Sequence, residues 1–415
     1  MAGDKMLMGL DIGSSKIRCV IGSVNHDGQL MVDSICERPS EGVRNGSIVN
    51  IELTLKAISS VVNEAELQAG AELSEVIIGI GGENIVCVPS NGVAGIKGNG
   101  QEIKQEDVMR SLEVARSFEL PPDREIIHTL VQEFNIDGQG GIKDPIDMLG
   151  HRLETKALIV TASASIAQNK RKCVMRSGLN IRRMVLQSLA DSEVVLSPEE
   201  KEMGVILINI GGGTSNMIVY SHGAPQYVAG INEGGDLVTS DLAQILNKPR
   251  QMAEQIKFDS GFSYVPSVSP EQMVTIPSVQ GMPAIVMPKR ELSRIIEARM
   301  AEIFSRLQQG MAKAGVGGNY GGGVVLVGGG SLLSGVTDLA HEIFGIPARL
   351  GFPEAIGGLD RNYINPGYTT VLGLLKYEAK KLGEQQQPRR RHEGDRAGSQ
   401  ESVASLIKGF FRTLF

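Results

Sequence analysis

The segment LMGLDIGSSKIRCVIG, residues 7–22, decides how the rest of the sequence is interpreted. Apolar runs lie on both sides of the turn DIGSS, so the pattern predicts two β-strands joined by a tight turn. The segment GVILINIGGGTSNMIVY, residues 204–220, has the same layout of strand, glycine-rich turn and strand. One such unit in each half of the chain predicts a duplicated α/β architecture whose halves face a shared cleft.

Apolar strands and amphipathic helices alternate along the rest of the chain. The pattern predicts a helix that ends at Gly70, a buried strand over residues 75–82 and a helix over 105–117. The run KALIVTASAS, residues 156–165, is expected to return to the sheet of the first half, followed by a crossover helix. A long helix is predicted from residue 289 to residue 311.

The composition excludes several classes of function. The net charge is −6, there is no Trp and 4% of the residues are aromatic, so nothing favours nucleic acid as a partner. The four cysteines have no CxxC spacing, which argues against a zinc site or a disulfide framework. No apolar stretch reaches the roughly 18 residues of a membrane span. We therefore expect a cytoplasmic protein with at most peripheral membrane contact.

Three glycine-rich turns are candidates for binding phosphate: DIGSS at 11–15, NIGGGTS at 209–215 and GGGS at 328–331. Glycine lets backbone N–H groups approach phosphate oxygens, and Ser and Thr add hydroxyl donors. Asp11 at a strand end suits a water molecule of hydrated Mg²⁺. GGGS is expected to lead into a helix, whose N-terminus favours anions. The P-loop motif GxxxxGK[ST] is absent from the sequence.

The order of phosphate turn, insertion, second phosphate turn and GGGS turn resembles the actin-like ATPase superfamily. Over nearly its whole length the chain resembles more closely the FtsA family of bacterial cell-division proteins. The matching stretches are GLDIGSSKI, PPDREIIHTLVQEFNID, PIDMLGHRLE, INEGGDLVTSDLA, AEQIK, VLVGGGSLLSGV and NPGYTTVLGLL.

This resemblance implies an ATP and Mg²⁺ site. It assigns to the nucleotide the residues Asp11, Gly13, Ser14, Ser15, Lys16, Asn209, Gly211, Gly212, Gly213, Thr214, Gly234, Gly235, Glu254, Lys257, Gly328, Gly329, Gly330 and Ser331. Gln187 lies where relatives place a residue that orients the attacking water; taken alone, it is equally a polar residue at a strand end. Glu254 and Lys257 taken alone are a helix-surface pair three residues apart.

The chain departs from the family at two positions. Relatives commonly carry Asp where this chain has Asn209, and often Asp where it has Asn216. An amide can hydrogen-bond a metal-bound water but supplies no negative charge to hold the cation, and phosphoryl transfer depends on such charges. We therefore hypothesise that ATP binds but is hydrolysed slowly or not at all, and that the nucleotide acts as a switch.

The resemblance and the composition together predict the domain division. The fold expected is an actin-like two-lobed fold, with duplicated ribonuclease-H-like halves, an inserted small α+β subdomain and a C-terminal amphipathic helix. The predicted parts are a first lobe (1–83 and 154–200), an insertion (84–153), a second lobe (201–240 and 323–382), an extra subdomain of the second lobe (241–322), a linker (383–401) and the terminal helix (402–415).

The family places self-association and recruitment of later division proteins in the insertion, and binding of the C-terminal tail of the tubulin-like ring protein FtsZ in the extra subdomain. Without the resemblance, the sequence alone favours the interpretation of the insertion as an inert elaboration. The leading hypothesis is that this protein is an adaptor that tethers the division ring to the inner membrane. The alternatives are another actin-like cytoskeletal or pilus-assembly ATPase, or a metabolic kinase on the same scaffold, for which we identify no acceptor-site base.

The last segment, SVASLIKGFFRTLF, separates its residues by polarity when placed on a helix. Lys408 and Arg412 fall on the polar half. The apolar half contains Val403, Leu406, Ile407, Phe410, Phe411, Leu414 and Phe415. This pattern predicts a helix at the surface of anionic lipids, on the cytoplasmic side of the inner membrane. The alternative is a helix that packs on the folded body or on a partner.

Overall fold

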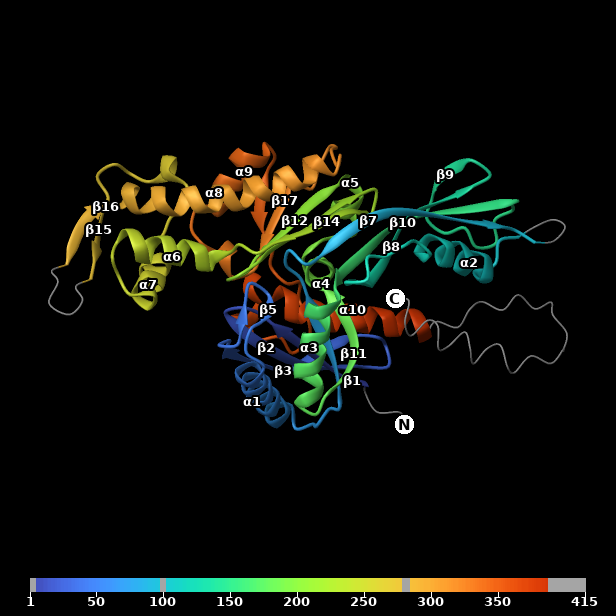
Figure 1. Cartoon of the computed structure of the whole chain (residues 1–415), viewed down its shortest axis with the longest axis horizontal. Helices are drawn as coiled ribbons and strands as arrows, with labels where there is room; N and C mark the ends of the chain where they lie inside the picture. The colour runs from blue at the N-terminus through green and yellow to red at the C-terminus, as the bar shows by residue number, and fades with distance from the viewer. Residues whose placement is uncertain (1–4, 98–101, 278–283, 387–415) are drawn as a thin grey trace.

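The computed structural model describes residues 5–97, 102–277 and 284–386. Within these ranges the chain forms two α/β lobes, one above the other, and a smaller α/β unit at one side (Figure 1). No helix among the described residues has the length and apolar character needed to cross a bilayer. The predicted membrane-binding residues, 403–415, and most of the predicted linker lie outside the described residues.

The first lobe is built on a five-stranded sheet in the order β11-β6-β1-β2-β3. Its strands are β1 (Lys5–Ile12), β2 (Lys16–Val24), β3 (Leu30–Pro39), β6 (Glu75–Ile80) and β11 (Asn180–Leu186), with a small hairpin of β4 (Val43–Arg44) and β5 (Ser47–Ile48). β1 and β2 pair antiparallel along their whole length, as predicted, while β6 lies parallel to both β1 and β11.

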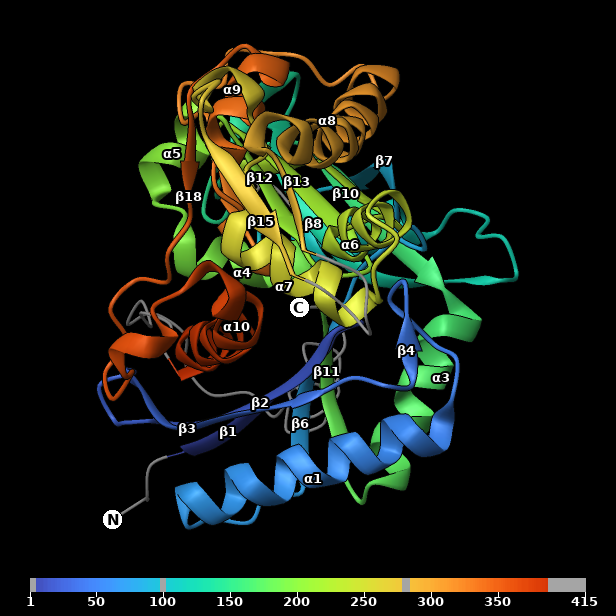
Figure 2. The same cartoon turned by 90° about the vertical axis from the view of Figure 1, so that its left-hand side faces the viewer.

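Helices cover both faces of this sheet. They are α1 (Ile51–Ala69), α3 (Ala164–Arg176), α4 (Gln187–Val195) and α10 (Thr369–Gln386). Figure 2 shows α1 below the sheet and α10 above it. The Asn50 side chain accepts a hydrogen bond from the Leu53 N–H and caps the start of α1. Gly70 ends it in the left-handed conformation, at the predicted position.

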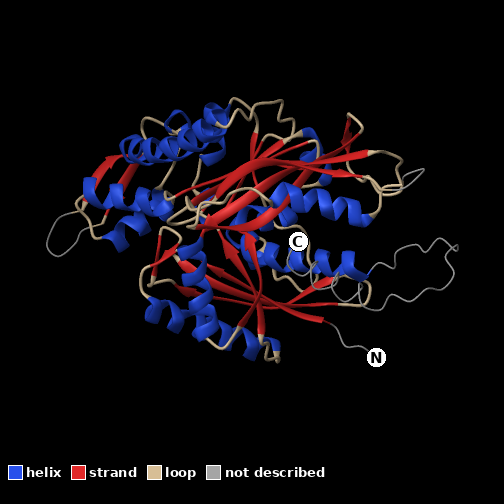
Figure 3. Ribbon diagram, turned by 45° about the vertical axis from the view of Figure 1, so that its right-hand side comes forward, coloured by secondary structure: helices blue, strands red, loops and turns tan. Residues whose placement is uncertain are grey.

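The second lobe repeats the strand pattern of the first. Its sheet runs β14-β13-β12-β17-β18, with an antiparallel meander on one side of β12 and parallel strands on the other. The strands are β12 (Val205–Ile210), β13 (Ser215–Ser221), β14 (Ala224–Ile231), β17 (Val324–Val327) and β18 (Ala348–Leu350). The duplication predicted from the two β-turn-β segments is therefore present in the fold (Figure 3).

The remaining elements of the second half cover this sheet and extend it outward. The helices are α5 (Pro198–Met203), α6 (Gly235–Ile245), α7 (Arg250–Ser260), α8 (Lys289–Lys313) and α9 (Val336–Phe344). A hairpin of β15 (Met273–Ile276) and β16 (Ile285–Pro288) lies at the outer end, and there are short 3₁₀ turns η1 (Val265–Ser267), η2 (Gly329–Leu332), η3 (Arg361–Tyr363) and η4 (Pro366–Tyr368). The last helix, α10, continues to Gln386 and so into the segment assigned to the linker.

The side unit, called the insert below, is a four-stranded sheet in the order β7-β10-β8-β9 with one helix. Its elements are β7 (Val86–Gly95), α2 (Gln105–Arg116), β8 (Arg124–Ile136), β9 (Gln139–Ile142) and β10 (Arg152–Ser163). The expectation that residues 156–165 return to the first-lobe sheet is wrong. β10 pairs antiparallel with β7 and β8 along its length, because its alternate residues cover the insert's own core.

The insert is connected in sequence to the first lobe, but it packs against β14 of the second lobe. The Gln132 side chain on β8 donates hydrogen bonds to the Pro225 carbonyl and to Gln226, both at 3.0 Å. The Cys87 thiol on β7 donates to the Val228 carbonyl at 3.3 Å. The insert therefore bridges the two lobes.

Candidate functional site

A cleft of about 570 Å³ lies between the lobes, and the three glycine-rich turns line it. Most of the residues expected at a nucleotide come together there. Those that line the cleft are Asp11, Gly13, Ser14, Ser15, Lys16, Gln187, Asn209, Gly211, Gly212, Gly213, Thr214, Gly235, Glu254, Lys257, Gly328, Gly329 and Gly330. Gly234 and Ser331 are not among the lining residues; they shape the turns.

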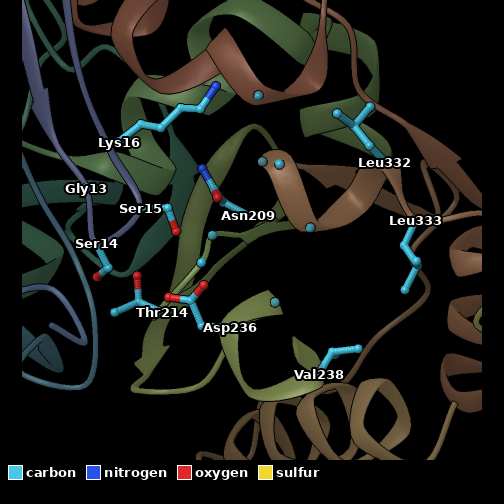
Figure 4. Close-up of a pocket in the computed structure, with 18 of the residues that line it drawn as sticks. Gly13, Ser14, Ser15, Lys16, Asn209, Thr214, Asp236, Val238, Leu332 and Leu333 are labelled. Carbon is cyan, nitrogen blue, oxygen red and sulfur yellow. The ribbon is translucent and has the colours of Figure 1, made fainter. Parts of the chain in front are cut away.

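The two phosphate-type turns face each other across the cleft. A Cβ atom at Gly212 would lie 1.8 Å from the Ser15 hydroxyl, and one at Gly213 would lie 2.6 Å from the Ser14 hydroxyl. Figure 4 shows Ser14, Ser15 and Thr214 close together on the left of the view. Glycine is therefore required for this approach, which directs hydroxyl and backbone N–H donors from both lobes to one place.

Gln187, the first residue of α4, is held at the floor of the cleft. Its Nε2 donates to Asp11 Oδ1 at 2.8 Å, and its Oε1 accepts from Asn216 Nδ2 at 3.4 Å. The Asn216 Oδ1 accepts from the Gly82 N–H at 2.6 Å. Gln187 therefore contacts Asp11, the carboxylate assigned to Mg²⁺. Its hydrogen bonds join Asp11 of the first lobe to Asn216 of the second lobe.

Lys170 on α3 is a buried cation beneath this floor that sequence reasoning missed. Its side chain is 1% exposed, and its Nζ donates to the Gly79 carbonyl at 3.2 Å. Burial lowers the pKa of Lys170, while the negative charge of Asp11 acts in the opposite direction. No sequence signal pointed to it, because a lysine on an amphipathic helix usually faces solvent.

The side chain of Asn209 is fixed by a buried carboxylate on α4. Asn209 Nδ2 donates to Asp191 Oδ2 at 2.7 Å and to Thr370 Oγ1 at 3.0 Å. The hydroxyls of Thr369 and Thr370 both donate to Asp191 Oδ1 at 2.8 Å. Burial raises the pKa of Asp191 to about 6, although these three donors act to lower it.

One wall of the cleft carries two cations that share one carboxylate. Lys16 and Arg18 both pair with Glu37, Arg18 at 3.1 Å, and the Tyr368 hydroxyl donates to Glu37 at the same distance. Burial alone would raise the pKa of Glu37, but the hydrogen bond from Lys16 and the charge of Arg18 lower it overall. Arg18 and Tyr368 were not anticipated, although Tyr368 lies within the matching stretch NPGYTT.

The opposite end of the cleft is apolar. Figure 4 shows Val238, Leu332 and Leu333 there, away from the serines, and Met300 and Phe258 also line the cleft. This end suits a flat, weakly polar group such as a nucleobase.

Glu254 and Lys257 border this apolar end from α7. Lys257 Nζ donates to Glu254 at 2.8 Å, to the Gly235 carbonyl at 3.1 Å and to Thr239 at 2.8 Å. The pair that sequence alone could not distinguish from a surface pair therefore ties α7 to α6 beside the cleft.

The GGGS turn differs from the expectation that it opens a helix. Residues Gly329–Leu332 form the 3₁₀ turn η2, closed by a hydrogen bond from the Ser331 hydroxyl to the Gly328 carbonyl at 2.7 Å, and α9 begins only at Val336. An α-helix N-terminus therefore does not start at this turn.

Gly234 precedes α6 and packs so closely that a Cβ there would lie 2.4 Å from the Gly211 carbonyl oxygen.

The residues of the cleft fit a Mg-nucleotide. Facing glycine turns and serine hydroxyls suit phosphate oxygens, and the apolar end suits a base. Asp11 is a buried carboxylate at the floor, which suits a hydrated Mg²⁺ that takes its other ligands from water and phosphate. Among the described residues, no group of three or more His, Cys, Asp or Glu side chains is placed to hold a metal ion.

Comparison with family models gives two matches. Residues 206–373 match the model "Cell division protein FtsA", and residues 82–161 match "SHS2 domain inserted in FTSA". The second range contains β7, α2, β8 and β9 and all but the last two residues of β10.

Curated relatives and solved structures agree with these matches. The chain is 39% identical to cell division protein FtsA of Borreliella burgdorferi, over 98% of each chain, and 38% identical to that of Pseudomonas aeruginosa, over 91% of this chain and 90% of the relative. Its fold resembles a PilM-PilN type IV pilus biogenesis complex, with a TM-score of 0.61 and 15% identity over 90% of this chain and 98% of that chain. It also resembles MreB5 of Spiroplasma citri bound to ADP, with a TM-score of 0.54 and 11% identity over 92% of this chain and 99% of that chain. With its duplicated lobes, its inserted SHS2 domain and its actin-like neighbours, the chain belongs to the FtsA family of cell division proteins.

Proposed function

We propose that this protein binds ATP in the cleft between its lobes, self-assembles, and tethers the FtsZ ring to the cytoplasmic face of the inner membrane while recruiting later division proteins. The observation that carries the proposal is the approach of the two glycine turns, since Gly212 and Gly213 meet Ser15 and Ser14 across the cleft. A plain turn does not require such an approach; an anion held from both sides does.

Each end of the cleft has its own role in this proposal. Backbone N–H groups of residues 211–214 and the hydroxyls of Ser14 and Ser15 bind the phosphates, and Asp11 holds Mg²⁺ through a water. The apolar end beside Glu254 and Lys257 receives the ribose and adenine. Bound Mg²⁺ supplies charge neutralisation at the phosphates.

Hydrolysis is slow in this proposal. Asn209 supplies an amide where relatives commonly carry a carboxylate, and both of its N–H groups are directed to Asp191 and Thr370. Gln187 can orient a water, since it is hydrogen-bonded to Asp11, but one carboxylate leaves the cation with less negative charge. The nucleotide then acts mainly by stabilising the closed, assembled form.

Membrane attachment and FtsZ binding rest on the sequence and the family. The apolar half of residues 402–415 supplies the lipid contact, and the extra subdomain, 241–322, receives the FtsZ tail. Full burial of a large apolar side chain is worth roughly 1.5–3 kcal/mol, but partial depth and the ordering of the segment remove much of this. One copy therefore binds reversibly, and an assembled row binds far more firmly.

Nucleotide binding is tested with the full chain and a fluorescent ATP analogue. We expect saturable binding, weakened at least about tenfold in Gly212→Ala, whose Cβ collides with Ser15. Gly95→Ala is the matched control, because no heavy atom lies within 4 Å of a Cβ there. Absence of saturable binding by the unchanged protein would refute the nucleotide site.

Membrane tethering is tested by co-sedimentation with anionic vesicles, FtsZ and Mg-ATP. We expect FtsZ to sediment only when this protein is present, and the Phe410→Glu/Phe411→Glu variant to stay in the supernatant with FtsZ. Ser402→Glu/Ser405→Glu adds the same charge to the polar half and should lose much less. If the phenylalanine variant sediments like the unchanged protein, residues 402–415 are not the anchor.

A further inference from the structure

Asp191 is a buried acid with no place in the family's nucleotide motifs. It lies on α4 and is 0% exposed, where α4 meets the first strand of the second lobe and the start of α10. A carboxylate without solvent is costly unless hydrogen-bond donors surround it. Here the donors come from two other elements: Asn209 on β12, and Thr369 and Thr370 on α10.

The hydrogen bonds close into a ring that fixes the orientation of the Asn209 amide. A carboxylate only accepts, so the Asn209 group at 2.7 Å from Asp191 must be its NH₂. The second N–H of that group points to Thr370 Oγ1 at 3.0 Å, and the Thr370 hydroxyl donates on to Asp191 at 2.8 Å. Both donors of the amide are therefore used, and they are used because residue 191 is an acid.

An acid at position 209 would be incompatible with this ring. Its oxygen would replace a donor 2.7 Å from Asp191, so two buried carboxylates would meet without a proton between them. An Asp side chain at 209 would also have no N–H to donate to the Thr370 hydroxyl. Conversely, with Asn at 191 and Asp at 209, the amide at 191 would donate and the carboxylate at 209 would accept, so the pair would again have one donor and one acceptor.

We propose that Asp191 is a positioning residue that orients the Asn209 amide at the cleft floor, and that positions 191 and 209 together hold a single carboxylate. In this chain the acid stands on α4, one step behind the cleft, instead of on the strand that lines it. The consequence for cation binding rests on the proposed nucleotide function: Asn209 lines the cleft, so exchanging the two residues moves a negative charge to its surface.

The ring is tested without nucleotide by a double-mutant cycle on the full chain. The melting temperature is measured at pH 7.5 for the unchanged protein, Asp191→Asn, Asn209→Asp and the double variant. We expect Asn209→Asp to lower it by about 5 °C or more, and the double variant to recover at least half of that loss. If Asn209→Asp melts like the unchanged protein, or if the two losses simply add, the proposal is wrong.

A matched control separates this pairing from the general cost of an added charge. Asn216→Asp makes the same change in the same cleft, but one oxygen at this position already accepts the Gly82 N–H at 2.6 Å, and the other meets the neutral Gln187 Oε1 at 3.4 Å instead of a buried carboxylate. Asn216→Asp should lower the melting temperature by less than half as much as Asn209→Asp. If Asn209→Asp does not fold, the double variant must still fold and must melt within about 2 °C of Asp191→Asn, because only then does Asn at 191 rescue the acid at 209. A double variant that also fails to fold would overturn the proposal.

A second experiment measures how the affinity for the fluorescent ATP analogue depends on the Mg²⁺ concentration. In the double variant the half-saturating Mg²⁺ concentration should fall about tenfold, because a second carboxylate then lines the cleft. An unchanged concentration would contradict the assigned position of the acid. If the unchanged protein binds no nucleotide at all, the proposed function fails, while the melting cycle still decides the ring.

Discussion

At the scale of single residues, His128 connects the insert to the side of the first lobe that faces the cleft. It lies on β8, is buried, and its Nε2 accepts the N–H of Leu186 at 3.0 Å, immediately before Gln187. Its ring meets Tyr377 edge to face. Burial lowers the pKa of His128 to about 3, and the positive charges of Arg183 and Lys381 add to this. The imidazole is therefore neutral in the folded protein.

This histidine should make the protein sensitive to acid. The unfolded chain takes up a proton below pH 6.5 that the folded chain excludes, so the stability is full above that pH and falls as the pH falls towards 3. The contribution of His128 to the loss of stability at pH 5 should be about 2 kcal/mol. Urea unfolding at pH 7 and pH 5 should show a smaller loss in His128→Gln than in the unchanged protein, whereas exposed His26→Gln should keep the full loss.

Asp191 contributes to the same pH profile with the opposite sign. Its raised pKa gives stability that is present below pH 3.8 and is lost as the pH rises through about 6. Because this contribution is common to the unchanged protein and to His128→Gln, the difference between them isolates the histidine. Equal losses in the two proteins would mean that His128 is not buried as described.

Sequence reasoning found those site residues whose chemistry is written into local motifs. The glycine turns and Asp11 could be identified because a turn between two strands constrains residue type within a few positions. Asp191 and Lys170 could not be identified, because each lies on a helix whose pattern gives no sign that this position is buried. Their burial depends on contacts with strands far away in the sequence.

At the scale of elements, α4 and α10 cross with almost no space between them. A Cβ at Gly373 would lie 2.1 Å from the Ala190 carbonyl oxygen, so the α10 backbone touches the α4 backbone there. The same helix is fixed to β11 by Glu378, which is 1% exposed and pairs with Arg182 at 2.6 Å and Arg183 at 2.9 Å.

The close contact gives a prediction with a control in the same helix. Gly373→Ala should destabilise the protein by about 3 kcal/mol, because the helices must separate or the backbone must shift. Gly383→Ala meets no atom within 4 Å and should be neutral or should stabilise by up to about 1 kcal/mol. Thermal melting of both variants measures this; similar melting temperatures would show that the helices are not in backbone contact.

Sequence patterns identified most elements but not all of their partners. The hairpins, α1 and α8 follow from periodicity and capping, which are local. The assignment of β10 failed because an apolar run predicts a strand without saying which sheet the strand joins. The end of α10 at Gln386 was missed because Gln and Glu are good helix formers that also dominate linkers.

At the scale of the whole molecule, the insert limits how the two lobes can move. It is covalently joined to the first lobe and hydrogen-bonded to β14 of the second through Gln132 and Cys87. Opening the cleft by separating the lobes on this side would have to break those contacts.

Removing one contact should loosen the second lobe locally. Gln132→Ala deletes the hydrogen bonds to Pro225 and Gln226, so amide hydrogen exchange in β14 should accelerate roughly tenfold. Lys143→Ala is the control, since its pair with Glu202 also joins the insert to the second lobe but both side chains are mostly exposed. Equal exchange in the two variants would mean that Gln132 does not hold the lobes together.

The course of α10 has a mechanical consequence. The helix begins with Thr369 and Thr370, whose hydroxyls donate to Asp191 behind the cleft floor, and it continues to Gln386, from where residues 387–401 lead to the segment proposed to hold the lipid. Because a helix resists stretching and Glu378 holds this one in place, tension applied at Gln386 is transmitted along α10 to the base of the cleft between the lobes. In the proposed function, a pull from the bilayer and a nucleotide in the cleft therefore act on the same few hydrogen bonds.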